Sequence, residues 1–432
     1  MRTSNLKEKK TKKQVTVELL RTGDPWIDCG TVVLFHRVNS RIAAVPNGID
    51  LQWHEQDKDK LVIRGATYRV VEGFLKDIFE QVKSNLYVEK TGNNVCVFNE
   101  EKGQFQVVPK INLVGLVGFL FSGGDLKVKY HKKPLTQKLR KKLEKFKERY
   151  SGQRKIEFKV DDKSRVYASS PHYNWPYKPR LEDETTSCSF CGRTMPCADL
   201  HSNNYPFAVA TAHFRNFFSN LKLEPKICSL CELASLLAVN AMFFNLSDRR
   251  RRLFLAIPHA QSLDELYQFW RDIPPLLPVK PLSQLSNILD EGYRYRRLNE
   301  SALAFCLELY LKLRGIKESD KWLAETSSKA WHFYSASKNG KTVSFEGYIH
   351  FTDLHRLFRL FSSLKAPEAF KQTFQSLAIQ QGNEWRTELR DRMAQRIIKN
   401  APLNEVAERI AWEKGYVEGL TNFVEEYNVW RG

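Results

Sequence analysis

The chain has 432 residues, enough for about three domains of ordinary size, and 42% of them are hydrophobic and 12% aromatic. This composition excludes a disordered chain, and the longest apolar run, Leu113–Phe121, is too short to span a membrane. The 68 Lys and Arg residues outnumber the 49 Asp and Glu residues, so the formal charge of +19 favours a polyanionic partner, either nucleic acid or an anionic membrane surface. The alternative is a basic protein whose charges are scattered.

The N-terminal region is predicted to form mostly strands, separated by Gly, Asn and Asp turn signals. Its basic first residues, Met1–Lys13, have no apolar stretch behind them, so we expect no secretory signal and a cytoplasmic protein. One amphipathic helix is predicted at Val71–Asn85. The predicted strands are Gln14–Leu19, Thr31–Val38, Leu61–Val71, Val95–Phe98 and Phe105–Ile111.

Positive charge is concentrated between Lys127 and Lys155, where thirteen Lys and Arg residues accompany only two acids. Apolar and basic residues alternate at Leu126–Tyr130, which predicts a strand, and the apolar spacing in Leu135–Tyr150 predicts an amphipathic helix. Because concentrated like charges are costly unless an anion neutralises them, this segment indicates binding to phosphates. The candidate DNA-backbone contacts are Lys127, Lys129, Lys132, Lys133, Lys138, Arg140, Lys141, Lys142 and Lys145, and Lys147 and Arg149 lie on the same helix.

A second basic cluster precedes a predicted strand at Leu253–Ile257. Arginine binds phosphate in two-point geometry and stacks on bases, so this cluster is a further candidate for DNA-backbone contacts. In a third cluster Arg294, Arg296 and Arg297 alternate with Tyr293 and Tyr295, and a charged helix surface is the alternative interpretation there. No helix has the Lys-rich, Trp- or Leu-backed pattern of a membrane anchor, so nucleic acid is favoured over a membrane. The second cluster consists of Arg249, Arg250, Arg251 and Arg252.

Four of the eight cysteines form two C-x-x-C pairs, Cys188/Cys191 and Cys228/Cys231. Both thiolates of such a pair can bind one tetrahedral ion at about 2.3 Å, so we predict a structural Zn²⁺ site. Disulfides or a redox pair are the alternatives, and they are disfavoured in an unsecreted chain with two such pairs. Four thiolates close the shell, which leaves no position for a catalytic water. Possible substitute ligands are Cys197, His201 and His213, and the expected buried thiols are Cys29, Cys96 and Cys306.

The C-terminal third is predicted to be helical. The stretch Pro274–Pro281 marks a boundary, after which apolar residues recur with a helical period. The predicted helices are Leu282–Arg314, Phe351–Leu364, Ala369–Gln381 and Asn383–Tyr427. The predicted fold is α+β, with a mixed DNA-binding region at 1–184, a zinc-binding insert at 185–240, a return and linker at 241–282, and a helical bundle at 283–432.

The sequence contains no complete catalytic motif. The H-E-x-x-H metalloprotease pattern fails at Lys58, and the P-loop-like Asn339–Thr342 lacks its first glycine because that position is Ser335. There is no zinc-deaminase signature and no nucleophile elbow. We therefore expect a protein without catalytic residues, although scattered carboxylates can still assemble in three dimensions.

Two sequence features together resemble one CRISPR-associated family. Thr22–Gly30 is similar to the family's opening pattern G-[ND]-P-[FW]-x-D-x-G, and the family is named for two CXXC pairs like those at Cys188/Cys191 and Cys228/Cys231. This family is the large subunit of the type I-B Cascade surveillance complex. The matched motifs cover about 20 residues, and their order, spacing and charge setting agree over most of the chain. The departures are the short chain and Cys29, where a small residue such as Ala is expected.

The resemblance implies a subunit near the 5′ end of a guide RNA, in an antiviral defence complex. Such a subunit recognises the protospacer-adjacent motif on target double-stranded DNA, aids duplex opening and supports the displaced strand, while RNA–DNA pairing reads the remaining sequence. The implied partners are the guide RNA, the target DNA, the backbone, 5′-handle-binding and small subunits, and helicase-nuclease or transposition proteins, with no membrane. The family's C-terminal helical part resembles the small subunit.

Tight polar loops are the best candidates for reading the motif, because glycine permits close approach and asparagine can pair with base edges. An ordinary hairpin turn is the alternative for each loop. Two other functions stay open: a nuclease or nucleic-acid-modifying enzyme with a structural zinc ribbon, and a stand-alone zinc-ribbon RNA-binding factor. The candidate motif-reading residues are Asn93, Asn94, Ser122, Gly123 and Gly124.

Overall fold

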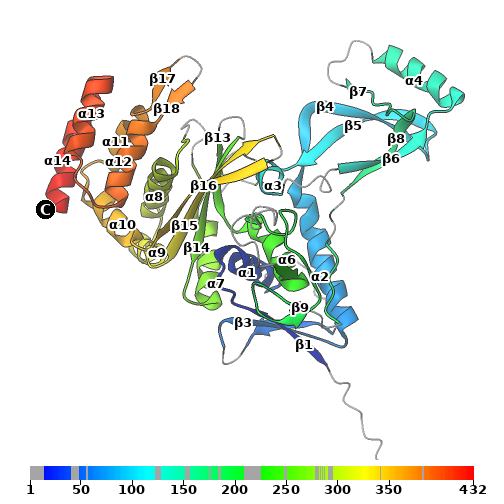
Figure 1. Cartoon of the computed structure of the whole chain (residues 1–432), viewed down its shortest axis with the longest axis horizontal. Helices are drawn as coiled ribbons and strands as arrows, with labels where there is room; N and C mark the ends of the chain where they lie inside the picture. The colour runs from blue at the N-terminus through cyan, green and yellow to red at the C-terminus, as the bar shows by residue number, and fades with distance from the viewer. Residues whose placement is uncertain are drawn as a thin grey trace, which may run out of the picture.

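The computed structural model describes residues 14–39, 48–54, 57–121, 128–150, 156–173, 175, 177–182, 186–208, 225–247, 251–277, 282, 284, 286, 288–289, 295–340, 342–381 and 384–432. Helices and sheets are mixed across these residues, which confirms the predicted α+β class (Figure 1). In this described part of the chain, no helix combines the length and the apolar character that crossing a lipid bilayer requires.

A small antiparallel sheet and two helices begin the chain. The strand order is β1 (Val15–Leu20), β3 (Lys60–Gly65), β2 (Asp50–Trp53), and the apolar side of α2 (Tyr68–Lys83) is buried, as its amphipathic pattern predicts. The prediction of a strand at Thr31–Val38 is wrong, because these residues lie in α1 (Pro25–Asn39). Nearly all of α1 is buried, and a segment that is apolar all round cannot be assigned to helix or strand from its period.

Helix α1 packs closely on α6 (Ser229–Leu237) in the first hydrophobic core. Gly30 permits this approach, since a Cβ atom there would lie 1.7 Å from the carbonyl oxygen of Ala234. Trp26 is fully buried, and its Nε1 donates to the carbonyl oxygen of Ser235 at 3.0 Å. The start of the chain and the helix that carries the second cysteine pair therefore share one core.

A separate module projects from this body at the upper right of Figure 1. Its sheet has the order β5 (Gln104–Leu113), β4 (Tyr87–Asn99), β8 (Arg165–Tyr173), β6 (Val128–Pro134), and the short β7 (Ile156–Glu157) pairs with β4. Helix α4 (Gln137–Arg149) lies over one face, and Leu139 and Leu143 form a small core with Phe98 and Phe105. The β4–β5 hairpin is flanked along the chain by η1 (Ser84–Leu86) and α3 (Gly115–Leu120).

A four-stranded antiparallel sheet joins the two halves of the chain. Its strands follow in the order β13 (Phe243–Ser247), β14 (Arg252–His259), β15 (Ala330–Asn339), β16 (Thr342–Phe351). Alternate residues of β14 enter two different cores: Leu253 and Leu255 belong to the first, and Phe254 and Ala256 to the second. The prediction of a helical bundle at 283–432 is corrected, because that interval contributes β15 and β16 to a sheet that begins at residue 243.

Helices make up most of the remaining C-terminal half and pack on the second face of this sheet (Figure 1). The helix expected at Leu282–Arg314 begins only at Leu298, and the segment Asn383–Tyr427 is divided among three helices and a short strand. In chain order, the elements outside the central sheet are α7 (Leu263–Asp272), η4 (Pro274–Leu276), α8 (Leu298–Arg314), α9 (Ser319–Ser327), α10 (Leu354–Ser363), α11 (Pro367–Ser376), β17 (Ile379–Gln381), β18 (Glu384–Arg386), α12 (Glu388–Ile398), α13 (Asn404–Lys414) and α14 (Leu420–Arg431).

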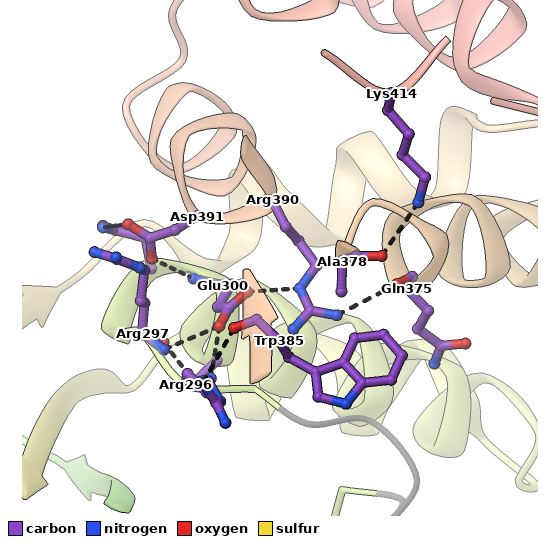
Figure 2. Close-up of polar contacts among 11 residues, drawn as sticks. Arg296, Arg297, Glu300, Gln375, Ala378, Trp385, Arg390, Asp391 and Lys414 are labelled. Atoms are coloured by element: carbon purple, nitrogen blue, oxygen red, sulfur yellow. Dashed lines mark hydrogen bonds and ion pairs between the residues drawn. The ribbon is translucent and has the colours of Figure 1, made fainter. Parts of the chain in front are cut away.

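A buried ion pair fixes α8 against α12 (Figure 2). Glu300 and Arg390 are both fully buried, and Arg390 Nε donates to Glu300 Oε2 at 2.5 Å. The other oxygen of Glu300 accepts hydrogen bonds from the backbone N–H groups of Arg296 and Arg297, while Asp391 accepts one from the backbone N–H of Glu300. Removing one partner of a buried pair costs about 3–5 kcal/mol, so this contact holds the two helices in one arrangement.

Candidate functional site

The first cysteine pair lies on a turn between two short strands. Cys188 follows β9 (Thr186–Ser187), and the chain turns back through Cys191 into β10 (Thr194–Met195). The backbone N–H of Gly192 donates to the carbonyl oxygen of Cys188 at 2.9 Å. Gly192 has a φ of +72°, which residues with a side chain rarely adopt, and this explains the glycine after Cys191.

The second pair lies where a strand meets a helix. Cys228 ends β12 (Lys226–Cys228) and caps α6, and Cys231 lies in the first turn of that helix. The backbone N–H of Cys228 donates to Cys188 Sγ at 3.4 Å, and β11 (Cys197–Asp199) pairs with β12. Because α6 packs on α1, the first hydrophobic core holds this half of the site in place.

The structure brings the four predicted ligands together. The Sγ atoms of Cys188, Cys191, Cys228 and Cys231 lie within 4.8 Å of one another, and those of Cys191 and Cys228 are 3.8 Å apart. A tetrahedron whose corners lie about 2.3 Å from its centre has edges of about 3.8 Å. The spacing is therefore compatible with a single tetrahedral metal ion.

Four sulfur atoms at this spacing cannot all be thiolates unless a cation lies among them. Hydrogen bonds with Cys191, Cys228 and Cys231 lower the pKa of the Cys188 thiol, whereas the contact with Cys188 raises the pKa values of Cys228 and Cys231. A divalent cation removes this conflict, because it stabilises the deprotonated form of every ligand. The donor set thus fits a thiophilic metal.

The other predicted ligands lie outside the cluster. Cys197 Sγ donates to the carbonyl oxygen of Met195 at 3.2 Å, the imidazole of His201 is exposed, and His213 lies outside the described residues. None of the eight cysteines, all of which are among the described residues, forms a disulfide. Burial raises the pKa of Cys96 to about 12, as expected for a thiol that serves packing. The thiols that are buried as predicted are Cys29, Cys96 and Cys306.

The cysteine cluster is part of the N-terminal body. The guanidinium of Arg193 donates to the carboxylate of Glu18 on β1 at 2.5 Å, which ties the first turn to the N-terminal sheet. The hydroxyl of Tyr177 donates to the carbonyl oxygen of Ser229 at 3.4 Å. Cys188, Cys228 and Cys231 belong to the first hydrophobic core, so the predicted insert at 185–240 is not a self-contained unit.

The Thr22–Gly30 motif forms the beginning of α1. Asp24 Oδ1 accepts the backbone N–H of Ile27 at 2.9 Å, and Asp24 Oδ2 accepts the hydroxyl of Tyr205 at 2.6 Å. Asp28 is buried and accepts both the backbone N–H and the hydroxyl of Thr22 at 2.8 Å. Burial raises the pKa of Asp28 to about 6. These contacts fix the start of α1, and Trp26 and Gly30 of the same motif contact α6.

Helix α4 presents an exposed basic surface. Thr136 caps the helix by accepting the backbone N–H of Leu139, and the buried leucines face the module core at the predicted period. Among the described residues, no acid lies within ion-pair distance of Lys138, Arg140, Lys141 or Lys145. The exposed cations of the helix are Lys138, Arg140, Lys141, Lys142, Lys145, Lys147 and Arg149.

Three other predicted contacts of this module have partners within it. Lys132 pairs with Asp161 at 3.0 Å and Lys133 with Glu100 at 2.8 Å. Lys142 Nζ donates to the carbonyl oxygen of Gly103 at 2.7 Å. These lysines stabilise the module, and the two that pair with acids contribute less free charge than the sequence suggests.

The arginine cluster is only partly described. Arg251 is exposed, and Arg252 pairs with Glu346 at 3.3 Å. Arg252 lines a cleft of about 640 Å³ that also includes Arg296 and Trp385 and no residue of α4, so the structure does not add Arg252 to the basic surface of α4. The predicted contacts outside the described residues are Lys127, Arg249, Arg250 and the side chain of Lys129.

The loop expected at Gly92–Asn94 is part of a strand. Asn93 and Asn94 lie inside β4, where the pairing with β5 shifts register between Glu89 and Asn94. Strand β5 supplies a partner for Asn94, so the chain bulges at this point instead of turning. The prediction that these asparagines lie on a tight loop is therefore wrong, and so is the alternative of an ordinary hairpin turn. The other motif-reading candidates, Ser122, Gly123 and Gly124, lie outside the described residues.

A pair of tyrosines on the projecting module was not predicted from the sequence. The rings of Tyr130 on β6 and Tyr167 on β8 stack with centroids 4.6 Å apart and an interplanar angle of 22°. Both line a cavity of about 450 Å³. No local pattern connects residues this far apart along the chain, and only the pairing of β6 with β8 brings them together.

The chain matches no protein-family model and no curated protein. Two features of the molecule's geometry bear on its function. One is a four-sulfur cluster suited to a metal ion, and the other is a basic helix surface suited to a polyanion.

Proposed function

We propose that this chain is a non-catalytic, DNA-binding large subunit of an RNA-guided type I CRISPR Cascade complex. The observation that carries the proposal is the exposed basic surface of α4, on which Lys138, Arg140 and Lys141 have no acidic partner among the described residues. DNA phosphates neutralise such a surface, and the release of their counterions favours binding. The Thr22–Gly30 motif and the two CXXC pairs support assignment to the type I-B large subunit.

In this proposal the cations of α4 follow the phosphates of the target duplex and supply affinity without reading sequence. Recognition of the protospacer-adjacent motif, duplex opening and support of the displaced strand belong to neighbouring surfaces of the same subunit. The guide RNA reads the remaining target sequence by base pairing. The other Cascade subunits and a helicase-nuclease or transposition protein complete the set of partners.

We assign Zn²⁺ to the four-cysteine cluster. A tetrahedral set of four sulfurs is typical of zinc or of an iron–sulfur cluster, and the two-residue spacing within each pair, with a glycine after the first pair, favours a zinc knuckle. With all four positions filled by thiolates, no site remains for an activated water. The ion would therefore stabilise the fold by joining the Cys188 turn to the start of α6.

The DNA-binding part of the proposal is tested by reversing charge on α4. Lys141→Glu combined with Lys145→Glu, two exposed lysines of α4, should weaken binding to every duplex, and two lost phosphate contacts should reduce the slope of log K against log salt by about 1.8. The measurement is fluorescence anisotropy across a salt series. The matched control is Lys317→Glu with Lys399→Glu, the same charge change at exposed lysines of the C-terminal half. Equal slopes for the two double variants would contradict the assignment of α4.

The RNA-guided part has a separate readout. Purified from its native host, the chain should carry a guide RNA and several partner proteins. An alternative enzyme with a structural zinc site would instead cleave or modify nucleic acid alone with added Mg²⁺. Recovery of the chain without RNA, combined with metal-dependent turnover, would favour that alternative.

A further inference from the structure

The sheet of the projecting module uses its two faces differently. On the face covered by α4, Cys96, Phe98 and Val166 belong to the module core. Side chains alternate along a strand, so Val95 on β4 and Tyr167 on β8 point to the opposite face. Both of them line the cavity of about 450 Å³, and no residue of α4 does. The cavity and the basic helix therefore lie on opposite sides of one sheet.

Strand pairing places two tyrosines side by side on this second face. Lys132 on β6 pairs with Tyr167 on β8, and Tyr130 lies two residues earlier, at a shift in the pairing of these strands that leaves its ring against that of Tyr167. Their rings stack at 4.6 Å with an angle of 22°. Both rings are only partly buried, so a planar base entering the cavity can extend the stack.

The same cavity carries a surplus of positive charge. Lys110 Nζ lies 2.5 Å from one oxygen of Glu157, and Lys159 Nζ lies 3.7 Å from the other. The interaction with Tyr167, followed by that with Glu157, raises the pKa of Lys159, so its ammonium stays charged at neutral pH. Two cations share one carboxylate here, which leaves donors available for an anion. Asn112 adds an amide to the lining of the cavity.

We propose that this cavity binds one unpaired nucleotide of a single-stranded DNA or RNA segment. The base stacks on the Tyr130–Tyr167 pair, the amide of Asn112 bonds to the base edge, and a phosphate lies between Lys110 and Lys159. The volume is within the usual range for small-ligand sites, and aromatic residues on an open sheet face are a common way to hold unstacked bases. The inference rests on the proposed nucleic-acid-binding function and adds a single-strand site to it.

The test compares single strands with a duplex in the full-length chain. Labelled DNA and RNA single strands of roughly 12 nucleotides are titrated by fluorescence anisotropy, together with a blunt DNA hairpin whose loop is a non-nucleotide linker, so that all its nucleotides are paired. Tyr167→Ala should weaken single-strand binding roughly 5- to 150-fold, the effect of losing one stacked base, and leave hairpin binding unchanged. Retained hairpin binding also shows that the module is folded, since α4 packs on the same sheet. The stronger of the DNA and RNA arms identifies the source of the nucleotide.

Two further variants separate stacking and charge from general damage. Tyr167→Phe should restore single-strand binding, because it keeps the ring, and Tyr416→Ala, which removes a ring that is 90% exposed elsewhere, should have no effect. Glu157→Gln should strengthen single-strand binding, because it releases both lysines, and a misfolded module could not produce this gain. The matched control is Glu100→Gln, whose partner Lys133 lies over the Phe98 ring on the face covered by α4.

The outcomes distinguish this inference from the function on which it rests. If Tyr167→Ala weakens single-strand and hairpin binding equally, or leaves both unchanged, the cavity is not a nucleotide site. The proposed function is judged separately, and it stands if the α4 double variant loses hairpin binding. A wild-type chain that binds neither probe overturns both proposals. Loss confined to the single strands supports the inference.

Discussion

Replacing Gly30 with alanine tests the close packing of α1 on α6. The added Cβ would lie 1.7 Å from the carbonyl oxygen of Ala234 and 2.4 Å from its carbonyl carbon. Real Cβ contacts do not fall below 3.0 Å, so the helices must separate by at least about 1.3 Å, and the obstacle is backbone that cannot rotate away. Overpacking costs about 1–3 kcal/mol where side chains can adapt. We therefore expect a loss of about 3 kcal/mol, roughly a 150-fold change in the unfolding equilibrium.

The assay is urea unfolding followed by circular dichroism, with metal content measured on the same samples. The matched control is Gly73→Ala in α2, where a Cβ would meet no atom within 4 Å. That change should stabilise the chain by about 0.5–1 kcal/mol, because alanine is the better helix former. If Gly30→Ala gave the same midpoint as Gly73→Ala, the two helices would not be packed as described.

Two other predictions concern the metal cluster and the acid response. Cys188→Ser should release zinc and lower the midpoint of thermal unfolding. The control is Cys197→Ser, which changes a cysteine outside the cluster and should keep one zinc per chain by elemental analysis. Equal zinc contents in the two variants would refute the ligand assignment. Burial raises the pKa of Asp28 from 3.8 in the unfolded chain to about 6 in the native state. Between pH 3.8 and 6 the native carboxyl is therefore protonated while the unfolded one is not, and the free energy of unfolding falls by about 3 kcal/mol as the pH rises through this range. Asp28→Asn should remove this slope in urea midpoints at pH 4, 5 and 6, and parallel profiles for the two proteins would disprove the burial effect.

Local sequence patterns predicted the elements that have one buried face and one exposed face. Leu139 and Leu143 recur at a helical period among cations, so the boundaries and the buried face of α4 were predictable. The two CXXC pairs identified four ligands because the spacing itself constrains the geometry. In each case the informative residues are only a few positions apart in the sequence.

Features that depend on distant segments were not predictable. The start of the chain was assigned a strand at Thr31–Val38, because a helix buried on all sides has no polar face to show its period. The hairpin β15–β16 was missed because its strands lie among helices and pair with β14 from the preceding region. The Tyr130–Tyr167 stack arises only when β6 and β8 pair.

The central sheet has a consequence for synthesis of the chain. Strand β14 ends at His259 and its partner β15 begins at Ala330, 71 residues later. At roughly 5–20 residues per second, the ribosome needs roughly 4–14 seconds to supply that partner. During this interval the β13–β14 hairpin has an open edge and bare aromatic residues such as Phe254, which is the state that chaperones bind and that aggregates most readily. Nascent chains stalled between these two strands should therefore depend most strongly on chaperones.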